Sequence, residues 1–225
     1  MIGGGDFNRI DAISLTACTE ILNTKSIAFD TIKKDKLRAP RHGHSITCLK
    51  DKFLIVTGSR IEKEDAHKSV EQYNIDMDIW FDLPYLNNGR YYHSSCVLAE
   101  RWVYVFAGIA NATRKYFNSI ERLDTTAPGA SKVWELLDFP VDQFPVRQGP
   151  GSTQISANEV LIFGGFGGDY LKDVYVLKNN DKSIERIGDS IVKVFGYQMP
   201  TMFDSNSRCV ISADWQSKKT VMFKV

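Results

Sequence analysis

Arginine and histidine recur along the sequence at matched positions where they could do chemistry. Arg41 and Arg90 are each followed three residues later by a histidine, His44 and His93, and Arg147 stands in a looser copy of this pattern. Metal sites need three or four ligands in a defined geometry, and no Asp or Glu recurs beside these histidines. We therefore expect structural histidines, each hydrogen-bonded to a neighbouring loop, and neither a metal nor another cofactor.

Two glutamates, Glu71 and Glu121, also recur. Paired carboxylates could act as acid and base, but the repeat places them in separate units, farther apart than glycoside chemistry allows. Charge-assisted hydrogen bonds to a repeat arginine such as Arg90, or to loop amides, are the favoured role. The same reasoning favours a structural tie over a substrate clamp for Arg41 and Arg147.

Other catalytic signals are missing from the sequence. The glycine-rich stretch Gly164-Gly165-Phe166-Gly167-Gly168 lacks a following Lys-Ser/Thr, and a strand pattern comes after it, so no helix dipole is available for a phosphate. There is no Gly-x-Ser-x-Gly elbow, no Cys/His nucleophile context and no His-Glu-x-x-His. The sequence predicts a protein that is not an enzyme.

Composition bounds the class of protein. The 225 residues suit one or two domains, and 43% apolar with 24% charged residues is close to the globular average. Collagen-like, disordered and coiled-coil chains are therefore excluded. A net charge of +1 gives no electrostatic footprint for nucleic acid or an anionic membrane, so we expect neither partner. The many Phe, Tyr and Trp residues favour strands.

The cysteines and the first residues bear on the compartment. Cys18, Cys48, Cys96 and Cys209 are scattered without a C-x-x-C pair, which favours free thiols in a reducing compartment. No apolar run approaches the length of a membrane span, and the first residues carry neither a basic nor an apolar signal region. We expect a cytoplasmic location.

A repeat of about fifty residues organises the chain. Three apolar runs each end in a pair of small residues, and they align without a gap when Gly58, Gly108 and Gly165 share a column. Fragments of the same pattern stand at both ends of the chain. Further columns follow each glycine pair, with Val70, Ile120 and Val174 in one and with Trp80 and Trp134 in the next. Each unit therefore predicts four strands and a turn into the next arginine.

Physical chemistry supports this arrangement of strands. An apolar run of five residues is too short for a buried helix and suits a strand covered on both faces. The small-residue pair permits a positive φ and a close approach of neighbouring loops. Trp80 and Trp134 fall on the outermost strands, where a large ring could wedge between adjacent units.

The units resemble the kelch repeat. The segment 41–84 carries Arg-x-x-His-Ser, an apolar strand closed by Thr57-Gly58, then Val70-Glu71-Gln72-Tyr73, Trp80 and Leu83-Pro84. The segment 90–134 is similar. The resemblance implies four-stranded blades arranged radially as an all-β propeller. It predicts blades over 41–89, 90–146 and 147–196, with partial blades over 1–40 and 197–225.

The predicted propeller is incomplete or open, because three full units and two partial ones lie near the lower end of blade counts. The chain begins in a second strand and ends in a third. Two interpretations remain: a fragment of a longer kelch protein, or a small, open or five-bladed variant.

The resemblance also implies a non-catalytic module that binds an unidentified protein partner, as an adaptor or scaffold. Loops after the glycine pairs vary and reach one face, where function is usually carried. The expected partner-binding residues are Arg9, Arg60, Arg114, Lys115, Tyr116, Phe166 and Tyr170. The expected structural residues are Gly58, Gly108, Gly164, Gly165, Trp80, Trp134, Arg41, Arg90, His44 and His93. The alternative is an enzyme or carbohydrate-binding protein that uses a pocket at one end of the propeller.

Overall fold

The computed structural model describes residues 2–6, 14–23, 28–31, 37–38, 40–60, 66–110, 114–190, 201–214 and 219–224. This part of the chain is built from antiparallel strands, and its one helical element is a short 3₁₀ turn, Gly129–Ser131. Over these residues, then, no helix has the length and apolar character needed to cross a membrane.

Three complete four-stranded sheets follow one another in the chain, each with its strands in sequence order. The second sheet contains β4 (Ser45–Leu49), β5 (Phe53–Ser59), β6 (His67–Asn74) and β7 (Ile79–Leu83). The third contains β8 (Ser94–Leu98), β9 (Trp102–Phe106), β10 (Ile120–Asp124) and β11 (Trp134–Leu137). The fourth contains β12 (Gly151–Gln154), β13 (Glu159–Phe163), β14 (Asp173–Lys178) and β15 (Ser183–Asp189).

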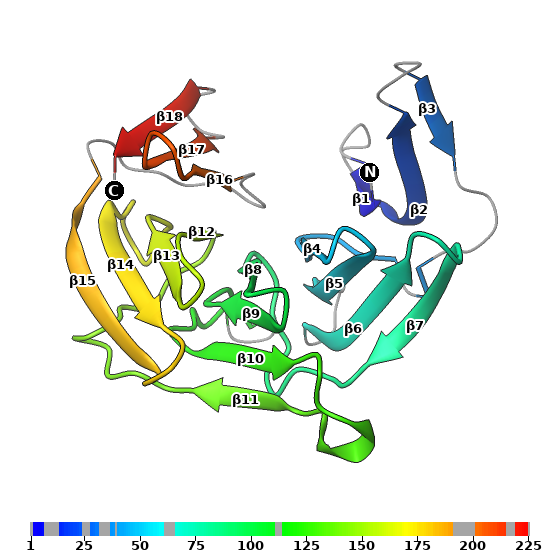
Figure 1. The fold of residues 1–225 in the computed structure, drawn as a ribbon, viewed down its shortest axis with the longest axis horizontal. Coiled ribbons are helices and arrows are strands. Elements are labelled where there is room, and N and C mark those ends of the chain that lie inside the picture. Colours follow the sequence, from blue (N-terminus) through cyan, green and yellow to red (C-terminus); the bar gives the residue numbers. More distant parts are fainter. Residues whose placement is uncertain are drawn as a thin grey trace.

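Two three-stranded sheets stand at the ends of the series. The first sheet contains β1 (Ile2–Asp6), β2 (Ser14–Asn23) and β3 (Ala28–Thr31), and the fifth contains β16 (Thr201–Asp204), β17 (Cys209–Asp214) and β18 (Lys219–Lys224). Figure 1 shows the five sheets in an arc, with β4, β8, β12 and β16 nearest the centre and a gap between the first and fifth sheets. The predicted all-β, incomplete propeller is confirmed; the predicted blade boundaries stay predictions.

The core lies between adjacent sheets, because the second strands of the three complete sheets are buried on both faces. Along β9, Val103 and Val105 pack toward the second sheet, whereas Tyr104 and Phe106 pack toward the fourth, and all four are 0% exposed. Alternation of side chains along a strand sends successive residues to opposite faces. This is why the second strands of these three sheets contain apolar runs.

The two tryptophans of the outer strands are buried, Trp80 at 4% and Trp134 at 5% exposed. The Nε1 of Trp134 donates a hydrogen bond of 2.8 Å to the carbonyl oxygen of Pro84, at the end of the second sheet. The ring thus ties two sheets together, with its polar atom paired. In the fourth sheet the corresponding position holds Ile184, paired with Leu177, which explains the missing tryptophan.

The glycine columns differ by one residue from the alignment made on the sequence. Strand register pairs Thr57 with Val70, but Phe106 with Ile120 and Phe163 with Val174. Gly58 is therefore equivalent to Ala107 and Gly164. Gly108 and Gly165 each stand one residue after that position.

Backbone conformation confirms this shift. Gly58, Ala107 and Gly164 have φ of 60, 59 and 62°, whereas Gly108 and Gly165 both have φ of 100°. A Cβ on Gly58 would lie 2.2 Å from the carbonyl oxygen of Arg90, so residue 58 itself admits only glycine, although its equivalent in the third sheet is alanine. The alignment of the sequence placed Gly58 with Gly108 and Gly165. In the structure, the residues equivalent to Gly58 are the ones that precede these two glycines, Ala107 and Gly164.

Candidate functional site

In each of the three complete sheets, one buried arginine is hydrogen-bonded at the end of the second strand. Arg41, Arg90 and Arg147 are 0% exposed, and each donates from Nη1 to a carbonyl oxygen 17 residues further along. The acceptors are Gly58, Ala107 and Gly164, at 2.8, 2.7 and 3.0 Å. The positive φ of these three residues turns their carbonyls toward the arginine, which links the sheet's entry segment to its second strand.

Each of these arginines has a carboxylate partner from the third strand of its sheet. Arg90 Nη2 lies 2.6 Å from Glu121, which is also 0% exposed. The same carboxylate accepts hydrogen bonds from the backbone N–H groups of Asn87 and Asn88. Arg41 pairs with Glu71 in the same way, so the charge is compensated in both sheets.

In the fourth sheet the buried arginine is also paired with a carboxylate, but the carboxylate is an aspartate. Arg147 makes a two-pronged pair with Asp173 at 2.7 and 2.9 Å, and Tyr175 donates to the same carboxylate. The guanidinium also lies over the rings of Phe144, at 4.6 Å, and Tyr175, at 5.0 Å. All three arginines are therefore occupied within the fold.

The repeated histidines are also buried. His93 Nε2 lies 2.8 Å from Thr57 Oγ1, and burial, together with the charge of Arg90, holds the pKa of His93 well below its usual value. The ring is therefore neutral. His44 is 2% exposed. Across the described ranges, no group of three or more His, Cys, Asp or Glu side chains could hold a metal ion.

A cavity of about 580 Å³ runs along the innermost strands β4, β8 and β12 and reaches Thr201 of β16. None of the described residues that line it is charged, and most of them carry a hydroxyl group. Cys48 and Cys96 line it, and burial raises the pKa of both thiols. The cavity therefore presents neutral thiols and hydroxyls, without a charged acid or base.

The connections at one end of the sheets are paired through their backbones. Tyr91 and Ile109 exchange hydrogen bonds of 3.1 and 2.9 Å, and Gln148 and Phe166 exchange bonds of 2.9 and 2.8 Å. At the equivalent place the N–H of Arg60 donates to His42 at 2.8 Å. We call this end of the molecule the loop face. Its framework is fixed by hydrogen bonds in all three complete sheets.

Aromatic rings gather on the loop face in two connected groups. Tyr92 contacts Tyr91 at 4.7 Å and His42 at 5.7 Å between ring centroids. Phe166 contacts Tyr116 at 6.1 Å and Tyr170 at 5.2 Å. Ile109 links the groups, because it bridges to both Tyr91 and Tyr116. We call these six rings the ring strip: His42, Tyr91, Tyr92, Tyr116, Phe166 and Tyr170.

Three cationic side chains stand beside the ring strip. Arg60 is half-buried, and Arg114 and Lys115 are exposed. Burial raises the pKa of the Tyr91 hydroxyl, and the charges of Arg60 and Arg114 oppose that shift, which places both arginines near this ring. Burial and Arg60 also lower the pKa of His42. Within the described ranges none of the three cations forms an ion pair.

The structure thus places six of the seven residues predicted for partner binding on the loop face. The seventh, Arg9, lies outside the described residues. His42, Tyr91 and Tyr92 also lie on the loop face but were not predicted for partner binding, because they follow the repeated arginines, whose segment was predicted to be structural. Their signal was the pair Tyr91-Tyr92 at positions where the preceding unit has His42-Gly43.

Comparison with known families agrees with this architecture. Residues 1–211 match the family model described as the KLHDC2/KLHL20/DRC7 Kelch-repeats domain. The chain belongs to the kelch-repeat family. Kelch domains generally are protein–protein interaction modules and bind protein partners. Among curated proteins, no relative matches this kelch chain.

Proposed function

We propose that this kelch domain binds a protein partner through the loop face, as a non-catalytic adaptor or scaffold. The observation that carries the proposal is that the cations of the loop face lack ion pairs among the described residues, whereas the buried arginines have them. Arg60, Arg114 and Lys115 stand beside the ring strip without an ion pair among the described residues, whereas the arginines that hold the sheets are all compensated. Unpaired cations next to exposed ring surface suit a partner that supplies the missing contacts.

The composition of the loop face fits recognition of a protein segment. Tyrosine and arginine are the residue types that dominate interface hot spots. Half-buried rings such as Tyr116, Phe166 and Tyr170 are already ordered by their neighbours, so little conformational entropy is lost when a partner packs on them. The cations favour a partner segment with acidic side chains.

The cavity supports a non-catalytic role, because the described residues that line it supply no charged group for acid–base chemistry. Cys48, Cys96 and Cys209 are free thiols, which supports a reducing, cytoplasmic location for the domain.

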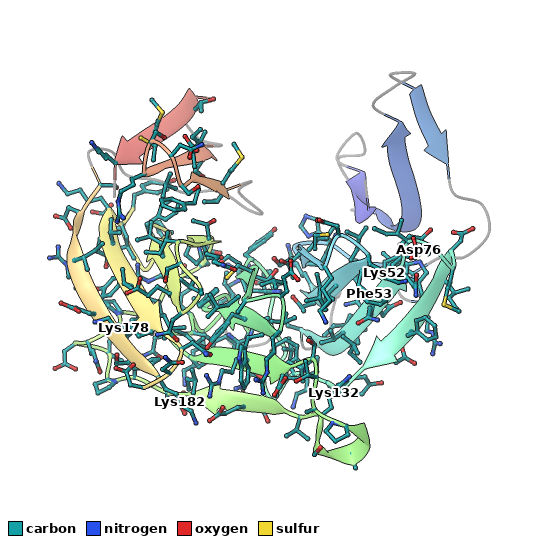
Figure 2. The ribbon with its side chains drawn as sticks, in the orientation of Figure 1. Lys52, Phe53, Asp76, Lys132, Lys178 and Lys182 are labelled. Atoms are coloured by element: carbon teal, nitrogen blue, oxygen red, sulfur yellow. The ribbon has the colours of Figure 1, made fainter. Side chains whose placement is uncertain are left out.

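Quantitative affinity capture from cell extract tests the proposal. Arg60→Glu and Arg114→Glu reverse charges on the loop face, and Lys132→Glu is the matched control. Lys132, labelled in Figure 2, lies in the connection between β10 and β11, at the opposite ends of these strands. We expect the two loop-face variants to lose a shared set of captured proteins that Lys132→Glu keeps.

All three variants should melt near the parent temperature, because none of the three side chains is buried or forms an ion pair within the described residues, and such surface substitutions usually change stability by less than about 0.5 kcal/mol. Capture of every parent partner by both loop-face variants would contradict the proposal. The turns around β4–β5 and β8–β9, at the other end, would then be the next candidates.

A further inference from the structure

Tyr92 has a backbone conformation that is unusual for its side chain. Its φ is 53°, and the equivalent residues in the second and fourth sheets are Gly43 and Gly149, with φ of 67 and 58°. The three residues are hydrogen-bonded in a chain: Tyr92 N donates to Gly43 O at 2.8 Å, and Gly149 N donates to Tyr92 O at 2.7 Å. The fold therefore requires the left-handed conformation here in every complete sheet and uses glycine in the other two.

A bulky aromatic residue in this region is an outlier, and such outliers gather at functional sites. Several other non-glycine residues with positive φ lie in tight turns between strands, among them Lys50, Asp51, Ala99 and Glu100, where that conformation is usual. Glycine at position 92 would relieve the backbone without changing the hydrogen-bonded chain. The ring of Tyr92 must therefore offer something that glycine does not.

The ring packs against two neighbouring segments of the loop face. It covers Gly43, where an added Cβ would come within 2.8 Å of the ring. It meets the rings of His42 and Tyr91 edge-to-face, at interplanar angles of 77 and 62°. The residue is half-buried, so the ring is held by its neighbours while part of its surface reaches solvent.

We propose that Tyr92 is the specificity-determining residue of the loop face, a proposal that rests on the proposed function. Its exposed surface takes an apolar side chain of the partner. Arg60, whose backbone N–H donates to the carbonyl oxygen of His42 at 2.8 Å, pairs with an acidic side chain close to that apolar residue. The partner chemistry is thus a segment in which an apolar and an acidic residue lie side by side.

The competing role for Tyr92 is packing alone, in which the ring only fills the space above Gly43. The two roles predict opposite results for Tyr92→Gly. Packing alone predicts a less stable protein with normal binding. The binding role predicts a protein of similar stability that has lost affinity, because relief of the backbone compensates the lost ring contacts.

The experiment uses a defined probe: a fluorescein-labelled peptide selected from a phage-displayed random library on the parent protein. Its affinity is measured by anisotropy for the parent, Tyr92→Gly, Tyr92→Phe, Arg60→Glu and Ala107→Gly, together with melting temperatures. Ala107→Gly is the matched control, because it relieves the same backbone conformation at a residue whose side chain is wholly buried and outside the ring strip.

We expect Tyr92→Gly to bind about tenfold or more weakly, as truncated hot-spot residues do. Its melting temperature should stay within about 3 °C of the parent value. Tyr92→Phe and Ala107→Gly should bind like the parent, and Arg60→Glu should bind weakly.

The other outcomes separate the two proposals. If Arg60→Glu loses affinity while Tyr92→Gly binds like the parent, the role of Tyr92 is wrong and the loop face stands. If Tyr92→Gly fails to fold, the ring is a packing element and the inference is overturned. If neither variant weakens the peptide, or the library yields no binder, the proposed function itself is contradicted.

Discussion

Two sets of arginines in this domain have the same charge and opposite surroundings. Arg41, Arg90 and Arg147 are wholly buried, each with a carboxylate and a backbone carbonyl within hydrogen-bond distance. Arg60 and Arg114 reach the loop face without an ion pair in the described part of the chain. In a repeat fold, the position within the repeat, more than the residue type, separates a structural arginine from one available to a partner.

The largest effect is expected from the buried set. Arg90→Met should lower the free energy of unfolding by about 3–5 kcal/mol, because it leaves Glu121 as an unpaired buried charge. Urea denaturation measures the change. The double variant Arg90→Met/Glu121→Met should recover much of the loss. A single variant that unfolds at the parent midpoint would show that this pair does not hold the sheet.

Trp134 tests the contact between sheets. Trp134→Ala should cost about 3–5 kcal/mol, as for other buried aromatic residues, and it also frees the carbonyl of Pro84. The control is the exposed neighbour Val133→Ala, which should change stability by less than about 0.5 kcal/mol. Equal denaturation curves for the two variants would be inconsistent with a ring wedged between sheets.

Acid should weaken the fold through its buried histidine. The pKa of His93 is lower in the folded state than the usual 6.5, so the unfolded chain binds more protons as the pH falls below that value. Stability should therefore decrease between pH 7 and 5, by at most about 1.4 kcal/mol per pH unit from this residue. His42, whose pKa is also lowered, adds to the slope. His93→Asn should flatten the dependence, and an unchanged slope would assign it to other groups.

A smaller effect is expected at the turn that receives Arg90. Ala107→Gly should raise the free energy of unfolding by about 1 kcal/mol, because alanine is strained at a φ of 59°. Gly164→Ala is the reverse change at the equivalent position and should lower stability by a similar amount. Chemical denaturation of both variants measures these changes. If the free energy of unfolding changed in the same direction in both variants, Ala107 and Gly164 would not be equivalent positions.

The smallest effect on stability is expected from the exposed set. Arg114→Glu should change the free energy of unfolding by less than about 0.5 kcal/mol, since its side chain is exposed and unpaired within the described residues. The same denaturation assay compares it directly with Arg90→Met. A loss of several kcal/mol at Arg114 would remove the distinction between the two sets.

The sequence predicted the fold better than the site, for physical reasons. Apolar runs such as 160–163 and the recurring glycines report burial and backbone conformation, which are local and repeat in every unit. The sequence did not predict that Gly58 is equivalent to Ala107, because Ala107 adopts a positive φ that is usual for glycine despite its Cβ. Alignment by residue type cannot detect such a position.

The loop face was predicted only in part. Arg60, Arg114 and the rings of Tyr116, Phe166 and Tyr170 were expected in variable loops, and the structure places them together. Their connection through Ile109 depends on backbone pairing between segments that no sequence pattern relates. Tyr92 was hidden because it occupies a column whose other members are structural.

Hydrogen–deuterium exchange of the domain with and without a captured partner tests the central claim most directly. The account predicts that partner binding slows exchange on the loop face, at residues 59–60, 91–92, 109–110, 114–117 and 166–170. Exchange at the opposite ends of the strands should not change. Protection confined to the turns at residues 50–52, 99–101 and 125–133, with the loop face unaffected, would contradict it.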